Sequence, residues 1–223
     1  MREVFLDIET TGLSFKDKHK IVEIACVETD NLISTKNIFH KLVNPQRDVP
    51  DEAYNVHGHS TEKLKSKQTF DEIAKDLLDF IKDKKIIIHN ARFDVGFLNN
   101  ELGLLNLEQI KFVNVVDTLE LARNKYPGTS NSLDALCRRF NIDLSKRGKH
   151  NALLDCQLLR EVYINILDLK EPKLIFSNDK IDENKIYEKN NKVKYSKKII
   201  YPDKEELEKH KKFIRTELKK NFY

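Results

Sequence analysis

Apolar positions near the start of the chain occur in short runs, whereas those further along recur at helical intervals. The early runs predict three strands, at residues 2–8, 20–29 and 36–43. A polar turn at residues 29–31 separates the second run from the third. These neighbouring runs therefore predict an antiparallel meander. The next stretch, up to residue 68, is rich in Asn, Pro and Asp and is expected to be a loop.

From residue 69 onward, helical and strand-like segments alternate. Thr69 and Glu72 have the spacing of a capping box, and Ser132 and Asn151 precede two further helical patterns as N-caps. The spacing predicts helices over residues 70–82, 91–102, about 118–126, 133–140 and 152–169, with strands over 85–88 and 112–116. A meander followed by alternating strands and helices predicts an α/β fold in which a mixed sheet is flanked by helices.

The pattern changes again after the last of these helices. Residues 1–169 would form one domain, and residues 170–192 are dominated by Lys, Asn, Asp and Glu, which favours a flexible linker. In the remaining segment, 193–223, an apolar stretch precedes a helical pattern over 203–220. The apolar stripe of that helix is narrow and consists of Leu207, Ile214 and Leu218. Such a segment is too poor in apolar residues to fold alone but is adequate to dock on a partner, and a solubilising extension is the alternative.

Composition narrows the class of protein. The 223 residues are 39% hydrophobic and 34% charged, which is typical of a globular protein with a charged surface. No run approaches the roughly 18 apolar residues of a membrane span, and Asp7 interrupts any signal-peptide pattern. The cytoplasm is therefore the expected location, with no membrane partner. Three widely spaced cysteines, Cys26, Cys137 and Cys156, indicate neither a disulfide framework nor a zinc site.

The basic excess of the chain, a net charge of +4, belongs to its tail. Residues 1–168 carry 24 basic and 26 acidic side chains, a net charge of −2, whereas residues 169–223 carry 16 and 10, a net charge of +6. A slightly acidic domain would bind a polyanion weakly by itself. Any action on nucleic acid is therefore expected to need metal ions or a partner.

Acidic side chains stand at three places in this pattern. Asp7 and Glu9 lie two residues apart in the first strand and so share one face, although a glutamate at such a place can also merely start a turn. Asp94 falls in the first turn of a helix, where a surface acid that complements the helix dipole is also common. Asp155 lies on the apolar stripe of the last helix of the domain, so either a shared metal or a paired Arg is expected to compensate its charge.

Three motifs surround these acids: DIETTG at 7–12, HNARFD at 89–94 and HNALLD at 150–155. In this order they resemble the DEDDh branch of the ribonuclease H-like exonucleases, in which a histidine, here His150, stands five residues before the last Asp. The similarity extends from residue 2 to about residue 168. Further segments resemble the proofreading subunits of bacterial replicative DNA polymerases, at residues 50–58, 131–137 and 145–147.

The resemblance implies a ribonuclease H-like fold and a 3′→5′ exonuclease that hydrolyses the end of a DNA strand. The four acids would hold two Mg²⁺ or Mn²⁺ ions roughly 3.5 to 4 Å apart, which activate water and stabilise the leaving 3′ oxygen. His150 would be the general base, a role suited to a side chain of a type that titrates near neutrality. Glu52 is implied as a substrate contact, although it is also compatible with an ordinary surface acid. The full set of implied contacts to the single-stranded 3′ end is Asp7, Glu9, Thr10, Leu13, Glu52, His57, Asn90 and Asp155.

Two protein partners follow from the same resemblance. The segment 193–223 would bind the alpha subunit, which is the polymerase subunit of such an enzyme. Residues 171–176 resemble a sliding-clamp-binding peptide at Leu174 and Phe176, although Glu171 stands where Gln is usual.

Two other functions are compatible with the sequence: an RNA-trimming exonuclease of the same family, and a mainly structural polymerase subunit. The long tail argues against RNA trimming. The intact set of acids argues against a scaffold, because a scaffold has no physical need for clustered carboxylates.

Overall fold

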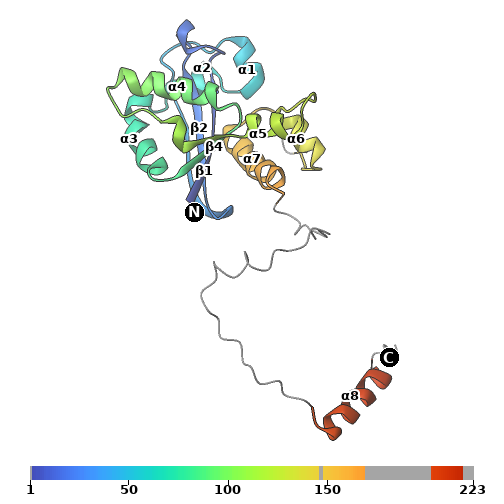
Figure 1. Ribbon diagram of the computed structural model, residues 1–223. Coiled ribbons are helices and arrows are strands. Elements are labelled where there is room, and N and C mark those ends of the chain that lie inside the picture. The colour runs from blue at the N-terminus through green and yellow to red at the C-terminus, as the bar shows by residue number, and fades with distance from the viewer. Residues whose placement is uncertain (1, 146–147, 169–201, 218–223) are drawn as a thin grey trace. The chain divides into compact units, whose positions relative to one another are not determined.

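The computed structural model describes residues 2–145, 148–168 and 202–217 (Figure 1). The chain divides near residue 173 into two units, which are treated separately below. The first unit holds the sheet and all the helices up to residue 168, and the second holds one described helix.

A five-stranded mixed sheet forms the centre of the first unit, with the strand order β3-β2-β1-β4-β5. β1 pairs antiparallel with β2, which pairs antiparallel with β3, whereas β4 runs parallel to both β1 and β5. The strands are β1 (Arg2–Thr10), β2 (Ile21–Asp30), β3 (Ile33–Leu42), β4 (Lys85–Ile88) and β5 (Val115–Asp117). The predicted meander and the predicted mixed sheet are both confirmed.

Helices cover both faces of this sheet. They are α1 (Asp51–His57), α2 (Thr61–Lys65), α3 (Phe70–Ile81), α4 (Ala91–Leu104), α5 (Thr118–Lys125), α6 (Leu133–Arg139) and α7 (Ala152–Ile166), with short 3₁₀ turns η1 (Phe15–Asp17) and η2 (Phe112–Asn114). Figure 1 shows α7 on one side of the strands and α3 on the other. The sheet therefore lies between two layers of helices.

Strand alternation decides which side chains of β1 meet which layer. Val4, Leu6 and Ile8 pack with the apolar faces of α3 and α4 in the larger core cluster. Phe5 points the other way and packs with Ala152, Cys156 and Leu159 of α7, among other residues. Because side chains of a strand alternate, the odd-numbered acids further along β1 share the α7 face with Phe5.

Capping residues set several helix starts where the sequence predicts them. The capping box of Thr69 and Glu72 is present, and the side chains of Ser132 and Asn151 accept hydrogen bonds from the first turns of α6 and α7. The Asp117 side chain caps α5. The sequence predicts these helix starts because the hydrogen bonds of a cap involve only residues of the same helix.

Three local predictions are wrong. Residues 51–57 and 61–65 form helices instead of the expected loop, with Pro50 and Ser60 at their N-caps. These helices are too short to show the apolar stripe by which a helix is predicted. The strand expected over 112–116 begins only at Val115, after a 3₁₀ turn. The turn between β2 and β3 is formed by Asn31 and Leu32, one residue later than expected, and both have positive φ.

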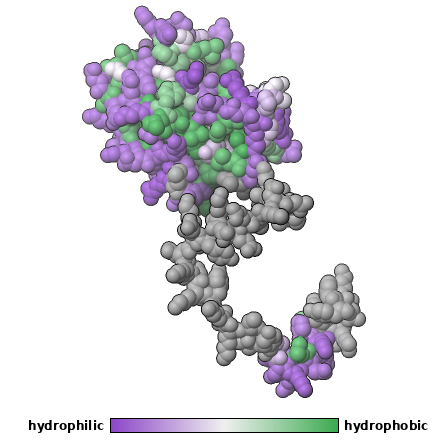
Figure 2. Space-filling view, viewed as in Figure 1, coloured by the Kyte–Doolittle hydropathy of each residue, from purple (hydrophilic) through white to green (hydrophobic). Residues whose placement is uncertain are grey.

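The second unit contains α8 (Lys204–Glu217), inside the predicted helix 203–220. Leu207 and Phe213 of this helix are exposed, and Figure 2 shows a small hydrophobic area on an otherwise hydrophilic α8. The side chains of Ile214 and Leu218 lie outside the described residues, as do the predicted linker and the apolar stretch before α8.

Two further expectations concern the whole described chain. None of the described helices is long and apolar enough to span a bilayer. Cys26, Cys137 and Cys156 are buried and free.

Leu77 of α3 is fully buried in the larger core cluster, so its truncation should weaken the fold. We expect Leu77→Ala to lower the free energy of unfolding by about 2–5 kcal/mol, through lost apolar burial and a residual cavity. Chemical denaturation measures the change. Leu104→Ala is the matched control, since Leu104 is 66% exposed and its truncation should change stability by at most about 0.5 kcal/mol. An equal loss in both variants would contradict this account of the core.

Candidate active site

Two acids project from the end of β1 toward the α7 layer. Asp7 and Glu9 lie within the strand, so Glu9 does not start a turn. The register with β2 shifts between Glu9 and Thr10, which marks a bulge at this point. A bulge increases the local twist and re-aims the side chains beside it. The end of β1 therefore presents two carboxylates on one face.

Asp94 joins this pair from the first turn of α4. It is only 3% exposed, and its Oδ1 accepts a hydrogen bond of 3.2 Å from the backbone N–H of Ile8, between the two acids of β1. The alternative of an ordinary surface acid is therefore wrong. Asn90, at the N-cap position of α4, makes no capping hydrogen bond with its side chain. Instead the Asp117 carboxylate accepts the backbone N–H groups of Asn90 and Ala91, at 3.1 and 3.0 Å.

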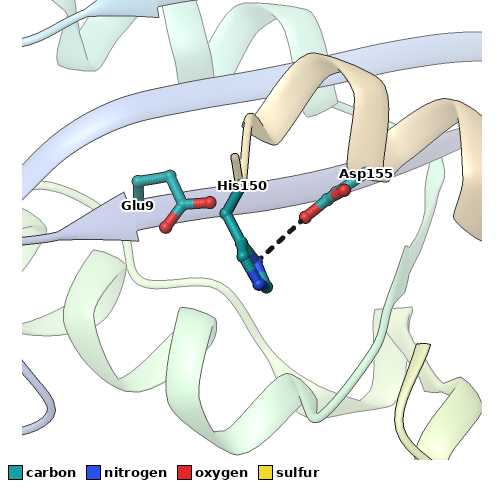
Figure 3. Close-up of side chains that lie close together, drawn as sticks. All are labelled: Glu9, His150 and Asp155. Atoms are coloured by element: carbon teal, nitrogen blue, oxygen red, sulfur yellow. Dashed lines mark ion pairs between the residues drawn. The ribbon is translucent and has the colours of Figure 1, made fainter. Parts of the chain in front are cut away.

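Asp155 and His150 approach from α7 and the residues that precede it. Asp155 is 3% exposed and shares the buried stripe of α7 with Leu159, Val162 and Ile166, as predicted. Its Oδ2 lies 3.5 Å from Nδ1 of His150. In Figure 3 the His150 ring points toward Asp155, with Glu9 of β1 on the other side of the group. The His150 side chain is 49% exposed, so the ring borders both the acids and solvent.

These side chains line one pocket, which we call the acidic pocket. Its volume is about 800 Å³, and its lining includes the predicted site residues Asp7, Glu9, Asn90, Asp94, His150 and Asp155. The opposite wall comes from α5 and the loop before α6, including Arg123 and Thr129. The three motifs, far apart in the sequence, thus meet at one place.

The donor atoms of this pocket fit a divalent metal ion. One donor atom each from Glu9, His150 and Asp155 lies within 4.8 Å of the other two. Asp7 and Asp94 add carboxylates to the same pocket. Hard divalent cations such as Mg²⁺ prefer carboxylate oxygens, so the residues present suit the metal dependence of this type of site.

Electrostatics leads to the same conclusion. Burial raises the pKa of Asp7 well above its usual value, and neighbouring carboxylates, led by Asp94 and Asp155, raise it further. Burial also raises the pKa of Asp94, although the hydrogen bond from the Ile8 amide opposes the change. Each negative charge therefore disfavours the others, and a bound cation would reverse that effect.

A second pocket, which we call the side pocket, lies next to the first and shares Ile8, Glu9 and Phe93 with it. Its volume is about 580 Å³. The remaining predicted substrate contacts all line it: Thr10, Leu13, Glu52 and His57. Every predicted site residue thus lines one pocket or the other, and Glu9 lines both.

His57 is held in one tautomer at the wall of the side pocket. Its Nδ1 accepts the backbone N–H of His59 at 3.0 Å, which places the proton of a neutral ring on Nε2. Burial, together with the nearby His59, lowers the pKa of His57 to about 4, so the ring is neutral at pH 7. Nε2 is buried and makes no well-formed hydrogen bond within the described residues, although the Thr10 backbone interacts with the ring and opposes the lowering of its pKa. His57 therefore presents a neutral ring at the wall of the side pocket.

One buried acid near the site was not predicted. Glu23 of β2 is 0% exposed and pairs across the sheet with Glu9. A sequence signal for it exists, since Glu23 interrupts the apolar run of residues 21–27 and a buried charge needs partners. Which partners it finds depends on the tertiary fold.

Sequence comparison places the chain among known proteins. A family model described as "Exonuclease" matches residues 4–163. The DNA polymerase III subunit epsilon of Rickettsia felis is 45% identical over 224 residues, which cover 98% of this chain and 98% of that protein. The protein of the same name from Escherichia coli K12 is 46% identical over 170 residues, covering 73% of this chain and 70% of its own length.

Solved structures share the fold. Exonuclease X in complex with 5′ overhanging duplex DNA has a TM-score of 0.57 at 24% identity, covering 76% of this chain and 93% of its own. The nuclease domain of 3′hExo, a DEDDh family member bound to rAMP, has a TM-score of 0.66 at 18% identity, covering 76% and 92%. With its three motifs gathered in one pocket and the family match extending over most of its length, the chain belongs to the exonuclease family whose model matches residues 4–163.

Proposed function

We propose that this protein is the 3′→5′ proofreading exonuclease of bacterial DNA polymerase III, which releases nucleoside monophosphates from the 3′ end of a DNA strand. The observation that carries the proposal is the convergence of four carboxylates and His150 in a pocket that adjoins a second pocket through Glu9. The epsilon-subunit names of relatives that match nearly the whole chain support the same function. Its place of action would be the cytoplasm.

The four acids would hold two divalent cations, Mg²⁺ or Mn²⁺. When bound, such ions neutralise the developing negative charge and lower the pKa of water. Asp7 and Glu9 would be fixed relative to each other by β1, and Asp94 would be fixed to them by its hydrogen bond from Ile8. The protein thus supplies the charge of the site and holds these three acids on fixed elements.

His150 would accept the proton of the attacking water. Its ring lies 3.5 Å from Asp155 and is half exposed, so it can reach a water in the acidic pocket and return the proton to solvent.

The side pocket would receive the terminal nucleotide. Neutral His57 offers an Nε2–H donor, Glu52 offers an acceptor and Leu13, 88% exposed, offers an apolar surface at the rim. Glu9 and Thr10 would lie between the nucleotide and the scissile phosphate. Asn90 lies on the acidic pocket, where it would contact the strand on the other side of that phosphate.

The tail would bind the alpha subunit of DNA polymerase III. A net charge of −2 on residues 1–168 gives the catalytic domain little affinity of its own for DNA. Tethering raises the effective concentration near a primer end to about the millimolar range. Residues 171–176 are a second candidate contact, with the sliding clamp, and lie outside the described residues.

One assay tests the function as a whole. Purified protein is incubated with DNA strands that have matched or mispaired 3′ ends and with an RNA strand, with and without Mg²⁺. We expect metal-dependent hydrolysis of DNA from the 3′ end, faster on mispaired ends. Preferential hydrolysis of RNA would favour a trimming enzyme, and the absence of hydrolysis would favour a structural subunit.

Asp7→Asn should abolish hydrolysis and leave the fold intact. The substitution removes a negative charge from a repulsive cluster, so the melting temperature in chelator should not fall. The loss of metal-ion catalysis is worth several kcal/mol, so we expect the single-turnover rate to fall at least about 10³-fold. Asp76→Asn, at an exposed position on α3, is the control. Activity within a few fold of wild type would rule out the metal site.

His150→Ala should slow the reaction without preventing metal binding. Because a general base contributes roughly 10² to 10⁴ in rate, we expect a loss of that size in single-turnover hydrolysis. Calorimetric titration with Mn²⁺ measures the metal affinity separately. His210→Ala, on α8, serves as the control. A collapse of metal affinity would show that His150 is a ligand, as its place beside Glu9 and Asp155 also permits.

A chain ending at Leu169 should keep full hydrolysis of single-stranded DNA and lose association with the alpha subunit. Every residue of both pockets precedes that point, because α7 ends at Ile166. Gel filtration of the full-length and shortened chains with the cognate alpha subunit measures association. Co-elution of the shortened chain would place the contact in the catalytic domain instead.

A further inference from the structure

Glu23 is a fifth carboxylate beside the four acids, yet its oxygens are engaged elsewhere. It lies opposite Glu9 in the β1–β2 pairing and is fully buried. Oε1 accepts from His40 Nε2 at 2.7 Å and from Asn151 Nδ2 at 3.0 Å. Oε2 accepts from His59 Nε2 at 2.9 Å and from the backbone N–H of Ala152 at 3.3 Å. Four donors therefore surround this carboxylate.

Such an environment makes Glu23 a structural anion and not a metal ligand. Although burial opposes ionisation, the hydrogen bonds from His40 and His59 lower the pKa of Glu23 to about 2. Because two donors already bind each oxygen, no lone pair is left in good geometry for a cation. Asp7 shows the opposite behaviour, because its burial and its acidic neighbours raise its pKa.

The donors on Glu23 belong to the segment that carries His150. Asn151 is the N-cap of α7 and Ala152 is its first residue, so both directly follow His150. On the other side, the backbone N–H of His150 donates to Val56 O at 3.0 Å. Lys149 donates to Tyr54 O at 3.3 Å, and its Nζ lies 4.5 Å from the centre of the Tyr54 ring. The backbone around His150 is thus held from both directions.

The contacts of Lys149 and His150, and the bond between Glu23 and His59, all lead to one segment, residues 54–59, which ends α1 and borders the side pocket. Val56 and His57 line that pocket, and His59 binds Glu23. Glu23 therefore joins the segment beside the side pocket to the segment that carries His150.

We propose that Glu23 is a positioning residue for His150: its buried carboxylate fixes residues 150–152 and ties them to the wall of the side pocket. This inference rests on the proposed function, since it assigns His150 a ring position that matters for the reaction. Because the His150 side chain is 49% exposed, the position of its ring depends in part on the backbone that carries it. Misplacement of a catalytic group by about 1 Å can cost roughly 10²-fold in rate.

Glu23→Gln tests the proposal with a minimal change in shape. Gln has one acceptor oxygen, so its amide group must face some of the present donors. Asn151 cannot flip to accommodate it, because its Oδ1 already accepts the Leu154 N–H at 3.0 Å. We expect kcat to fall about 10- to 100-fold, with KM and Mn²⁺ affinity within about twofold of wild type.

Glu28→Gln is the matched control. Glu28 is also a buried acid of β2, at 5% exposure, and pairs with Lys84 and Thr35 instead of the site. Its substitution should change kcat by less than about threefold, although it removes a buried charge of the same kind. An equal loss of kcat in both variants would show that Glu23 acts only on stability.

A double-mutant cycle separates positioning from a direct role. If Glu23 acts through His150, Glu23→Gln in the His150→Ala background should lower the rate by less than about twofold. A further loss as large as that in wild type would overturn the proposal. So would a tenfold loss of Mn²⁺ affinity in Glu23→Gln, because it would place Glu23 in the metal site.

Asn151→Ser covers the case in which Glu23→Gln does not fold. Serine is an equally good N-cap, so α7 keeps its start, but the bond from Asn151 Nδ2 to Glu23 is lost. We expect kcat to fall severalfold with KM unchanged. An unchanged kcat in this variant would contradict the proposal that Glu23 positions His150.

Hydrogen exchange provides a readout that needs no activity. Amide exchange across residues 148–154 should be faster by about tenfold or more in Glu23→Gln and unchanged in Glu28→Gln. Unchanged exchange in both variants would show that Glu23 does not fix the backbone around His150, even if the enzyme is active. If wild type shows no nuclease activity, the proposed function fails, while the exchange data still decide whether Glu23 holds this segment.

Discussion

Mutual repulsion among carboxylates is the constraint on which this site depends. Asp7 and Asp94 are both disfavoured as anions by burial and by their neighbours, so the acids would separate if the chain allowed it. A site of this kind therefore needs acids on elements that cannot move apart. The fold meets this need by placing each acid on a strand or at a helix terminus that the core holds in place.

Three features of the fold provide that rigidity. β1 lies in the middle of the sheet, where its first half pairs with β4 and both of its acids, further along, pair with β2. The Ile8 amide holds Asp94 against the same strand. Asp155 is carried on the buried stripe of α7, whose apolar residues pack on the sheet and on α5 and α6. Packing energy from the core thus opposes the electrostatic cost of the cluster.

Local chemistry explains what the sequence could predict. The capping box at Thr69 and the alternation along β1 depend only on neighbouring residues, so the matching elements were predicted almost to the residue. The short α1 and α2 were missed because helices of this length have too few turns to show an apolar period. For the site, the motifs predicted which side chains meet, but the partners of Glu23 come from three distant segments that only the tertiary fold brings together.

Glu9 and Glu23 show that two residues of the same type can have different roles in different surroundings. They face each other across two paired strands, and both are glutamates with little or no exposure. Glu9 borders two pockets lined by other acids, so a cation that enters them can interact with its charge. Glu23 is enclosed by four N–H donors from the protein, so its charge is already compensated and can only hold those donors in place. The four donors around Glu23, and not its residue type, thus keep it out of metal chemistry and let it shape the backbone around it.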